Sequence, residues 1–168
     1  ENKGWTYAKY LLEFERGNSY SPTLYRGIEK LKSIAKETSI GSGVNLIDDS
    51  DFLNKLNKCE IEIQALEFVE LRIFSALSAG QRVGPESSIL KTRGTELQQK
   101  LQELSVEAIG YWASPFVYDT FANINEPSIG PDYAMTIAPS YFNGRKTTIY
   151  AGSNEIQRNI ISKAVLGL

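Results

Sequence analysis

Apolar residues recur along most of the chain at intervals of three and four, which is the spacing of one helix face. In the first such stretch, residues 5–16, this face carries Trp5, Ala8, Leu12 and also Glu15. A carboxylate there can lie at the edge of the stripe and pair with a cation on another helix. It can also be partly desolvated, which raises its pKa and suits it to act as a general base. The spacing alone leaves both interpretations open.

Three longer helices follow a turn at residues 17–22, and each has a continuous apolar stripe. The stripe of the second helix consists of Leu24, Ile28, Leu31 and Ile34. The third helix is expected from Ser50 or Asp51 to Ala79–Gly80, with a stripe of Phe52, Leu56, Cys59, Ile63, Leu66, Ile73 and Leu77. The fourth is expected from Ser88 to about Ile109, with a stripe of Leu90, Gly94, Leu97, Leu101, Leu104 and Ala108. A glycine within such a stripe indicates that two backbones approach closely at Gly94. Residues 40–50 and 80–88 form the breaks.

Beyond Gly110 the pattern changes to an aromatic stretch interrupted by prolines. The stretch contains Tyr111, Trp112, Phe116, Tyr118 and Phe121. It is either a lid over a ligand or an ordinary packed crossover, and the spacing favours the crossover.

The C-terminal segment combines a short β-prone run, a turn and a helix. Thr147–Tyr150 is the run, Ala151–Gly152 is the turn, and Ser153 is the expected N-cap of a helix whose stripe carries Ile156, Ile160, Ala164 and Val165. A tight turn before a helix N-terminus directs unpaired N–H groups to one point, where a phosphate, a ring carbonyl or an oxyanion can bind. Many such junctions bind nothing, so the geometry alone does not establish a site.

Long helices with short breaks, no βαβ alternation and no fixed-period repeat predict an all-α fold, an up-and-down four-helix bundle with an extra C-terminal helix segment. A chain of 168 residues can bury a substantial core, and we find no internal boundary, so residues 1–168 are expected to form a single domain. The formal net charge of −2 gives no indication of a basic surface that would bind nucleic acid or an anionic membrane. No apolar run has the length of a membrane span.

The chain has no histidine and one cysteine, Cys59. His-based triads, metal sites with nitrogen or sulfur ligands, and internal disulfides are therefore excluded. Cys59 has a core spacing between Leu56 and Ile63, which indicates a small buried hydrophobe rather than a reactive thiol.

Residues 149–161, IYAGSNEIQRNII, with Leu166–Leu168 closing the chain, resemble the last helix of the flavin-dependent acyl-CoA dehydrogenases without a gap. Residues 1–5 and 11–16 resemble the entry into the C-terminal helical domain of that family. The resemblance implies a fragment without the family's N-terminal helical and β domains, and the start at Glu1 rather than methionine agrees with it. Residues 85–99 resemble bacterial members grouped with pimeloyl-CoA dehydrogenases.

The resemblance implies α,β-dehydrogenation of an acyl-CoA thioester, in which a carboxylate removes the α-proton and the β-hydrogen leaves as hydride to FAD. Many members carry this base at the position of Ala151, which cannot take a proton. Others carry it on the first helix of the domain, immediately before an arginine, as in Glu15–Arg16. We therefore expect Glu15 to be the base and the backbone N–H of Ala151 to polarise the thioester oxygen.

The same resemblance places Gly152, Ser153 and Glu155 at the flavin and Tyr150 beside the isoalloxazine and the acyl chain. Family members hold the flavin of a neighbouring subunit with an Arg-Lys-x-x-Phe-Gly stretch, which has no counterpart in residues 38–51.

The expected partners are an acyl-CoA substrate, an electron-transfer flavoprotein as acceptor, and further subunits in a homo-oligomer (dimer or tetramer) or a heteromer. The expected location is the cytoplasm of a bacterium, or the mitochondrial matrix in a eukaryote. The alternative is a non-catalytic paralogue, a subunit for assembly that kept the bundle and lost the chemistry. In either case the isolated fragment is expected to fold without turning over substrate.

Overall fold

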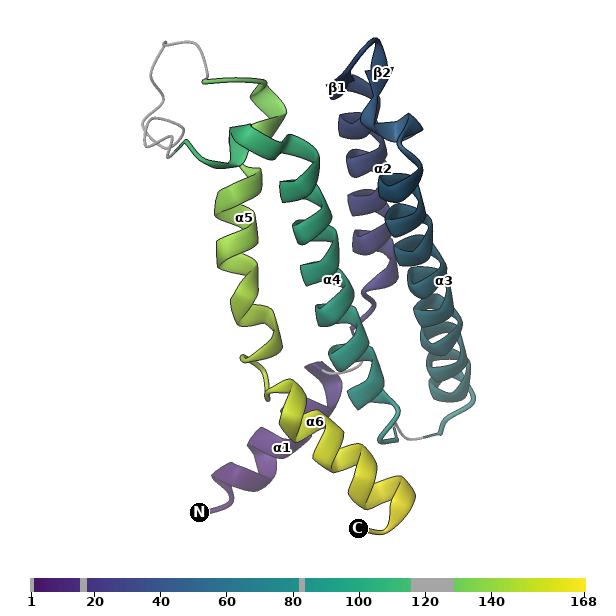
Figure 1. Cartoon of the computed structure of the whole chain (residues 1–168). Helices are drawn as coiled ribbons and strands as arrows, with labels where there is room; N and C mark the ends of the chain where they lie inside the picture. Colours follow the sequence, from purple (N-terminus) through teal and green to yellow (C-terminus); the bar gives the residue numbers. More distant parts are fainter. Residues whose placement is uncertain (1, 16–17, 82–83, 116–128) are drawn as a thin grey trace.

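Four helices run alternately up and down in the computed structural model (Figure 1). They are α2 (Ser21–Glu37), α3 (Ser50–Ser78), α4 (Ser87–Ile109) and α5 (Ile137–Gly144). The structure describes residues 2–15, 18–81, 84–115 and 129–168. Helix α4 is central, because it packs against α2, α3, α5 and the C-terminal helix α6 (Asn154–Ile161). The predicted all-α, up-and-down bundle with an extra C-terminal helix is confirmed.

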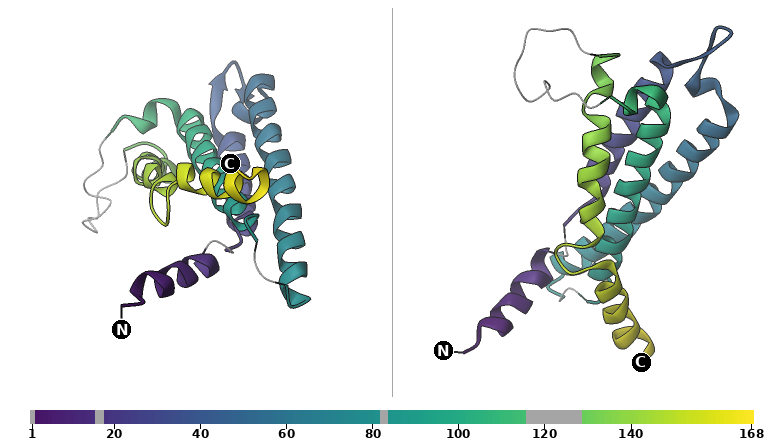
Figure 2. Two further views of the ribbon diagram at one scale, coloured as in Figure 1. Left: turned by 90° about the horizontal axis from the view of Figure 1, so that it is seen from below. Right: turned by 60° about the vertical axis from the view of Figure 1, so that its left-hand side comes forward.

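The fourth helix of the bundle is α5, which the apolar pattern did not predict. It follows the 3-10 helix η4 (Asp132–Ala134) and continues as the 3-10 helix η5 (Arg145–Thr148). With 8 residues, among them Pro139 in its first turn, α5 is too short to show a repeating stripe. The first predicted helix is present as α1 (Gly4–Glu15), but it leads away from the end of the bundle (Figures 1 and 2).

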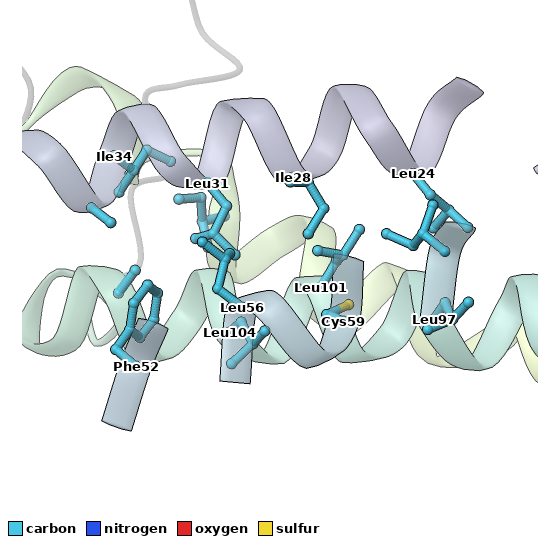
Figure 3. Packing of buried hydrophobic residues seen from close by; sticks show 14 of the residues in the cluster. Leu24, Ile28, Leu31, Ile34, Phe52, Leu56, Cys59, Leu97, Leu101 and Leu104 are labelled. Atoms are coloured by element: carbon cyan, nitrogen blue, oxygen red, sulfur yellow. The ribbon is translucent and has the colours of Figure 1, made fainter. Parts of the chain in front are cut away.

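The predicted stripes of α2, α3 and α4 supply the core between these helices. Side chains of α2 point toward those of α3 and α4 in Figure 3, with Ile28 of α2 facing Leu101 of α4 and Leu31 of α2 facing Leu56 of α3. The buried members of the predicted stripes are Leu24, Ile28, Leu31, Ile34, Phe52, Leu56, Cys59, Ile63, Leu66, Ile73, Leu90, Leu97, Leu101, Leu104 and Ala108. Only Leu77, in the last turn of α3, departs from the prediction, because it is exposed.

Carboxylates fix the ends of two of these helices. The side chain of Asp49 accepts a hydrogen bond from the backbone N–H of Phe52 at 2.8 Å and caps the N-terminus of α3. Glu70 of α3, 2 % exposed, caps α2 from the side. Its carboxylate accepts bonds from Ser19 Oγ (2.7 Å), from the N–H groups of Tyr20 and Ser21 (2.6 and 3.1 Å), and from Ser21 Oγ (2.6 Å). This explains an acidic residue on the buried face of α3.

Gly94 does not mark a close approach of two backbones, as the sequence suggested. The ring of Tyr20 lies where a Cβ at Gly94 would be. The glycine therefore makes room for an aromatic side chain at the start of α2, and this contact ties α2 to α4.

A small antiparallel hairpin replaces the predicted break between α2 and α3. Its strands are β1 (Ser39–Gly41) and β2 (Val44–Asn45), with Ser39 paired to Asn45 and Gly41 to Val44. The tip, residues 41–43, has positive φ angles throughout, which glycine adopts readily at positions 41 and 43 and which is less favourable for Ser42. The 3-10 helix η1 (Leu46–Asp48) leads from the hairpin into α3.

The tail differs from the prediction in two respects. The β-prone run at residues 147–150 forms no strand, because Thr147 and Thr148 belong to η5 and the Thr147 hydroxyl donates to the Gly144 carbonyl at 2.8 Å. The apolar stripe of the last helix is not buried: Ile156 is 51 % exposed and Val165 is 65 % exposed. The buried residues of α6 are Asn154 and Gln157. Helix α6 and the π-helical turn η6 (Ser162–Leu166) leave the bundle at the end opposite the hairpin, as α1 does (Figures 1 and 2).

Candidate functional site

Five of the six predicted site residues lie in one continuous segment, Tyr150–Glu155, which we call the tail turn. Ala151 and Gly152 both have positive φ, 56° and 81°, and Ser153 is the N-cap residue of α6. The turn and the helix start thus lie where the sequence predicted them. For an alanine this left-handed conformation costs roughly 1 kcal/mol, so the surrounding structure must hold it in place.

The tail turn presents backbone donors that the described part of the chain leaves unpaired. The N–H groups of Ala151, Gly152 and Ser153 bond to none of the described residues. They lie at the N-terminus of α6, where the helix dipole adds a partial positive charge. Such a group of donors can bind an oxyanion, a polarised carbonyl or the polar edge of a cofactor.

Side chains of α4 bond to residues before the tail turn and to Asn154 near its end. Its contacts come from Lys91, Thr95 and Gln99, which share one helix face at i, i+4 and i+8 and which we call the α4 polar row. The Gln99 amide donates to the carbonyls of Gly144 and Arg145, both at 3.2 Å. These two bonds anchor η5, which leads into the tail turn.

The other two members of the row hold the end of the turn. The ammonium of Lys91 donates to Asn154 Oδ1 at 2.8 Å, and the amide of Asn154 donates to Thr95 Oγ1 at 3.2 Å. Asn154 is the first residue of α6 and is buried. Within the turn, the Gly152 carbonyl accepts a hydrogen bond from the side-chain amide of Gln157 in α6 at 3.1 Å. The turn is therefore fixed before, within and after its strained residues.

The pKa values of two charged groups beside the turn are lowered, which disfavours the charged form of Lys91 and favours the charged form of Glu155. Burial lowers the pKa of Lys91, and the nearby carboxylate of Glu155 partly offsets this effect. A hydrogen bond from the Ser153 hydroxyl, together with its own backbone N–H, lowers the pKa of Glu155. Glu155 is therefore anionic at neutral pH, and Ser153 bonds to it rather than capping the helix.

Tyr150 at the start of the turn lies near the first turn of α2. Burial raises the pKa of the Tyr20 phenol, and the charges of Tyr150 and Glu70 raise it further. The Tyr150 side chain itself is exposed. The tail turn is thus next to the point where the chain passes from α1 into α2.

Glu15, the sixth predicted site residue, is the last residue of α1. Its side chain, like the whole of Arg16, lies outside the described residues. The end of α1 and the start of α6 lie at the same end of the bundle (Figure 2). On the predicted stripe, Trp5 is 72 % exposed and Ala8 is half-buried, so the described part of that stripe does not pack into the bundle core.

The predicted aromatic stretch falls mainly on residues 116–128, outside the described part of the chain. At its near edge Tyr111 is 92 % exposed. The Trp112 ring lies where a Cβ at Gly130 would be, so it packs against the residue that follows the stretch. Neither the lid nor the crossover interpretation is tested by these contacts.

Sequence reasoning missed the polar residues that hold the tail turn. Lys91, Thr95 and Gln99 repeat at four-residue intervals, and Asn154 and Gln157 are three residues apart. These spacings were visible, but polar residues at helical spacing normally indicate a solvated face. Only the packing of α6 on α4 shows that Lys91 and Thr95 on one helix and Asn154 and Gln157 on the other are buried.

Comparisons with known proteins agree on the family of this chain. Residues 2–166 match the family model "Acyl-CoA dehydrogenase, C-terminal domain". Acyl-CoA dehydrogenase FadE26 of Mycobacterium tuberculosis is 26 % identical over 172 residues, which cover 100 % of this chain and 41 % of that protein. Acyl-CoA dehydrogenase IpdE1 of the same organism is 27 % identical over 98 % of this chain and 38 % of its own length. The chain thus spans about two fifths of these relatives.

Solved structures show the same fold. The ChsE4-ChsE5 complex from Mycobacterium tuberculosis matches 100 % of this chain and 42 % of the solved chain, with a TM-score of 0.75 and 25 % identity. Butyryl-CoA dehydrogenase from Megasphaera elsdenii matches 99 % of this chain and 39 % of its own, with a TM-score of 0.73 and 17 % identity. At that identity the second match supports the fold alone.

Proposed function

Because the chain belongs to the acyl-CoA dehydrogenase family through its C-terminal domain, we propose that it is part of an FAD-dependent enzyme that dehydrogenates an acyl-CoA thioester. The observation that carries the proposal is the tail turn, where three backbone N–H groups without a partner among the described residues lie at the N-terminus of α6. The curated relatives named above are acyl-CoA dehydrogenases. Because this chain covers only part of them, the activity belongs to a longer protein.

The donors of the tail turn fit the flavin and the thioester. Gly152 and Ser153 offer backbone N–H groups, and the exposed Tyr150 side chain belongs to the same turn. We assign these residues and Glu155 to FAD. Bound there, FAD would accept the hydride that leaves the β-carbon. The fold neighbour "PigA with FAD and proline", at 16 % identity, has FAD in its title.

The chain's own residues would handle the proton and the developing charge. The Glu15 carboxylate takes the α-proton as the Cα–H bond breaks, and the electron pair forms the Cα–Cβ double bond as the β-hydride departs. Negative charge develops on the thioester oxygen in this step, and the N–H of Ala151 stabilises it. Because the donor is a backbone group, alanine serves here as well as any residue except proline.

The first test is to replace Glu15 by Gln in the full-length protein. Loss of a general base lowers kcat by roughly 10²–10⁴-fold, while the flavin stays bound. Glu13→Gln is the matched control, because a residue two positions earlier lies on the other side of α1. Flavin content and anaerobic bleaching by a panel of acyl-CoAs are measured for both variants. Unchanged turnover in Glu15→Gln would reject Glu15 as the base.

A second candidate function is a non-catalytic subunit that serves the assembly of a heteromeric dehydrogenase. It is favoured by Ala151, which provides no base in the tail turn, and by the hairpin, whose residues 39–45 carry no charged side chain for a neighbouring flavin. The solved neighbour ChsE4-ChsE5 is itself a complex. A full-length protein without a flavin band, even after reconstitution with FAD, would support this candidate over the enzyme.

Acceptor and location complete the proposal. We assign an electron-transfer flavoprotein as the electron acceptor and a homo-oligomer or heteromer as the assembly. Since the curated relatives are bacterial, we place the enzyme in the bacterial cytoplasm. No described helix combines the length and the hydropathy that a membrane span requires.

A further inference from the structure

Lys91, in the second turn of α4, is an unusual residue. It is 3 % exposed, and it takes part in none of the ion pairs among the described residues. Lys32, Lys55 and Lys100, by contrast, each pair with a carboxylate within 3.1 Å. The hydrogen-bond partner of the Lys91 ammonium is a neutral amide oxygen, Asn154 Oδ1.

Burial of this ammonium works against stability. Desolvation of a cation that forms no ion pair costs several kcal/mol or is reduced by a lowered pKa. The pKa of Lys91 is lowered in this way, and the charge of Glu155 offsets the effect only in part. An apolar side chain of similar length would fill the same space without that cost. Folding stability therefore does not account for a lysine here.

The position of its partner gives a different reason. Asn154 begins α6 and follows Ala151 by three residues. Ala151 itself is in the left-handed region at φ 56°, which it leaves unless its neighbours are held. The bond from Lys91 holds the end of the turn, whereas Gln99 independently holds η5, the segment that leads into the turn. The Lys91 ammonium also adds positive charge beside the N-terminus of α6.

We propose that Lys91 is a positioning residue for the dehydrogenation: through Asn154 it holds the Ala151 N–H in the direction of the thioester oxygen. The inference rests on the proposed function. A donor to a developing oxyanion acts only within a narrow range of distance and angle, and a displacement of about 1 Å can cost on the order of 10²-fold in rate. Lys91 does not touch the substrate, and its effect passes through the tail turn.

The test compares Lys91→Met with Lys100→Met in the full-length, FAD-loaded protein. Lys100 lies on the same helix, but its ammonium pairs with Glu62 of α3 at 3.0 Å, away from the tail turn. For Lys91→Met we expect kcat to fall by about 10²-fold with little change in KM and in flavin content. Isotope-edited infrared spectra of a bound enoyl-CoA should show the thioester C=O stretch shifted toward its value in water. Lys91→Arg should restore part of both signals, and Lys100→Met should match the wild type.

The outcomes separate this inference from the proposed function. An active wild type in which Lys91→Met and Lys100→Met have equal kcat and equal C=O frequencies overturns the inference and leaves the function intact. A wild type that bleaches with none of the acyl-CoAs overturns both. If Lys91→Met does not fold, Asn154→Ala takes its place: the same fall in kcat and shift in C=O stretch support the inference, and wild-type values overturn it.

Discussion

Individual polar residues, buried or half-buried, determine where the helices of this chain begin. Glu70 fixes the start of α2, Asp49 the start of α3, and the pair Lys91–Asn154 the start of α6. Each of these contacts satisfies backbone or side-chain groups that would otherwise be buried without partners. The Leu and Ile stripes bring helices together, and these polar contacts decide their register.

Glu70→Gln tests this at the start of α2. The glutamine would place an NH2 donor against Ser hydroxyls and N–H groups that now donate to a carboxylate, so we expect the free energy of unfolding to fall by about 2–3 kcal/mol. Glu67→Gln is the matched control on the same helix, because Glu67 accepts a single bond from the Tyr25 hydroxyl at 2.9 Å. Urea unfolding of chain 1–168 measures both. An equal loss in the two variants would contradict a special role of Glu70.

Cys59 provides a pH-dependent prediction at the same scale. Burial raises the pKa of its thiol to about 11, whereas an unfolded chain ionises it near the ordinary value of 9.0. Between these values the folded state binds more protons than the unfolded state, so stability is complete below pH 9.0 and falls as the pH rises toward 11. We expect a loss of about 2 kcal/mol over this range. Cys59→Ala should lack this component in urea titrations at pH 8 to 11, and an identical slope in both proteins would exclude it.

At the scale of elements, the sequence predicted the helices whose stripes are long. Helices α2, α3 and α4 begin and end within a few residues of the predicted limits, because 17 to 29 residues repeat their pattern several times. Helix α5 was missed because 8 residues do not. The buried face of α6 was assigned wrongly, because its buried residues are polar: Asn154 bonds to the polar row on α4, and Gln157 bonds to the Gly152 carbonyl. The periodicity of apolar residues does not reveal a contact between two helices when both contacting faces are polar.

Gly94→Ala tests the contact that joins the start of α2 to α4. A Cβ at this position would overlap the Tyr20 ring, so we expect the free energy of unfolding to fall by roughly 1–3 kcal/mol, even though alanine favours a helix. Gly27→Ala is the matched helical control: its Cβ would meet only Leu101 Cδ1, at 3.1 Å, and a flexible methyl group can yield. Urea midpoints of the two variants should therefore differ in sign or clearly in size. Similar midpoints would show that the Tyr20 ring moves aside freely.

For the molecule as a whole, apolar surface lies at the end where α1 and α6 leave the bundle. The exposed large side chains there are Trp5, Tyr7, Tyr10 and Leu11 on α1 and Ile156, Val165, Leu166 and Leu168 at the C-terminus. Such a concentration is typical of a surface that another part of the protein covers. The relatives are about two and a half times as long as this chain, and we propose that residues equivalent to the rest of their length cover this surface.

Hydrogen exchange tests whether the stability of α1 and α6 depends on contacts with residues outside 1–168. Helices of 12 and 8 residues are marginal by themselves, and most of the large apolar side chains that the structure describes on them are exposed. In chain 1–168 we expect the amides of α1 to exchange fastest, those of α6 next because Asn154 and Gln157 anchor it, and those of α4 slowest. In the full-length protein α1 and α6 should gain at least about 10-fold in protection, while α4 serves as the internal reference. If α1 is equally protected in both proteins, its packing comes from within residues 1–168, and the exposed end is not the surface that the rest of the protein covers.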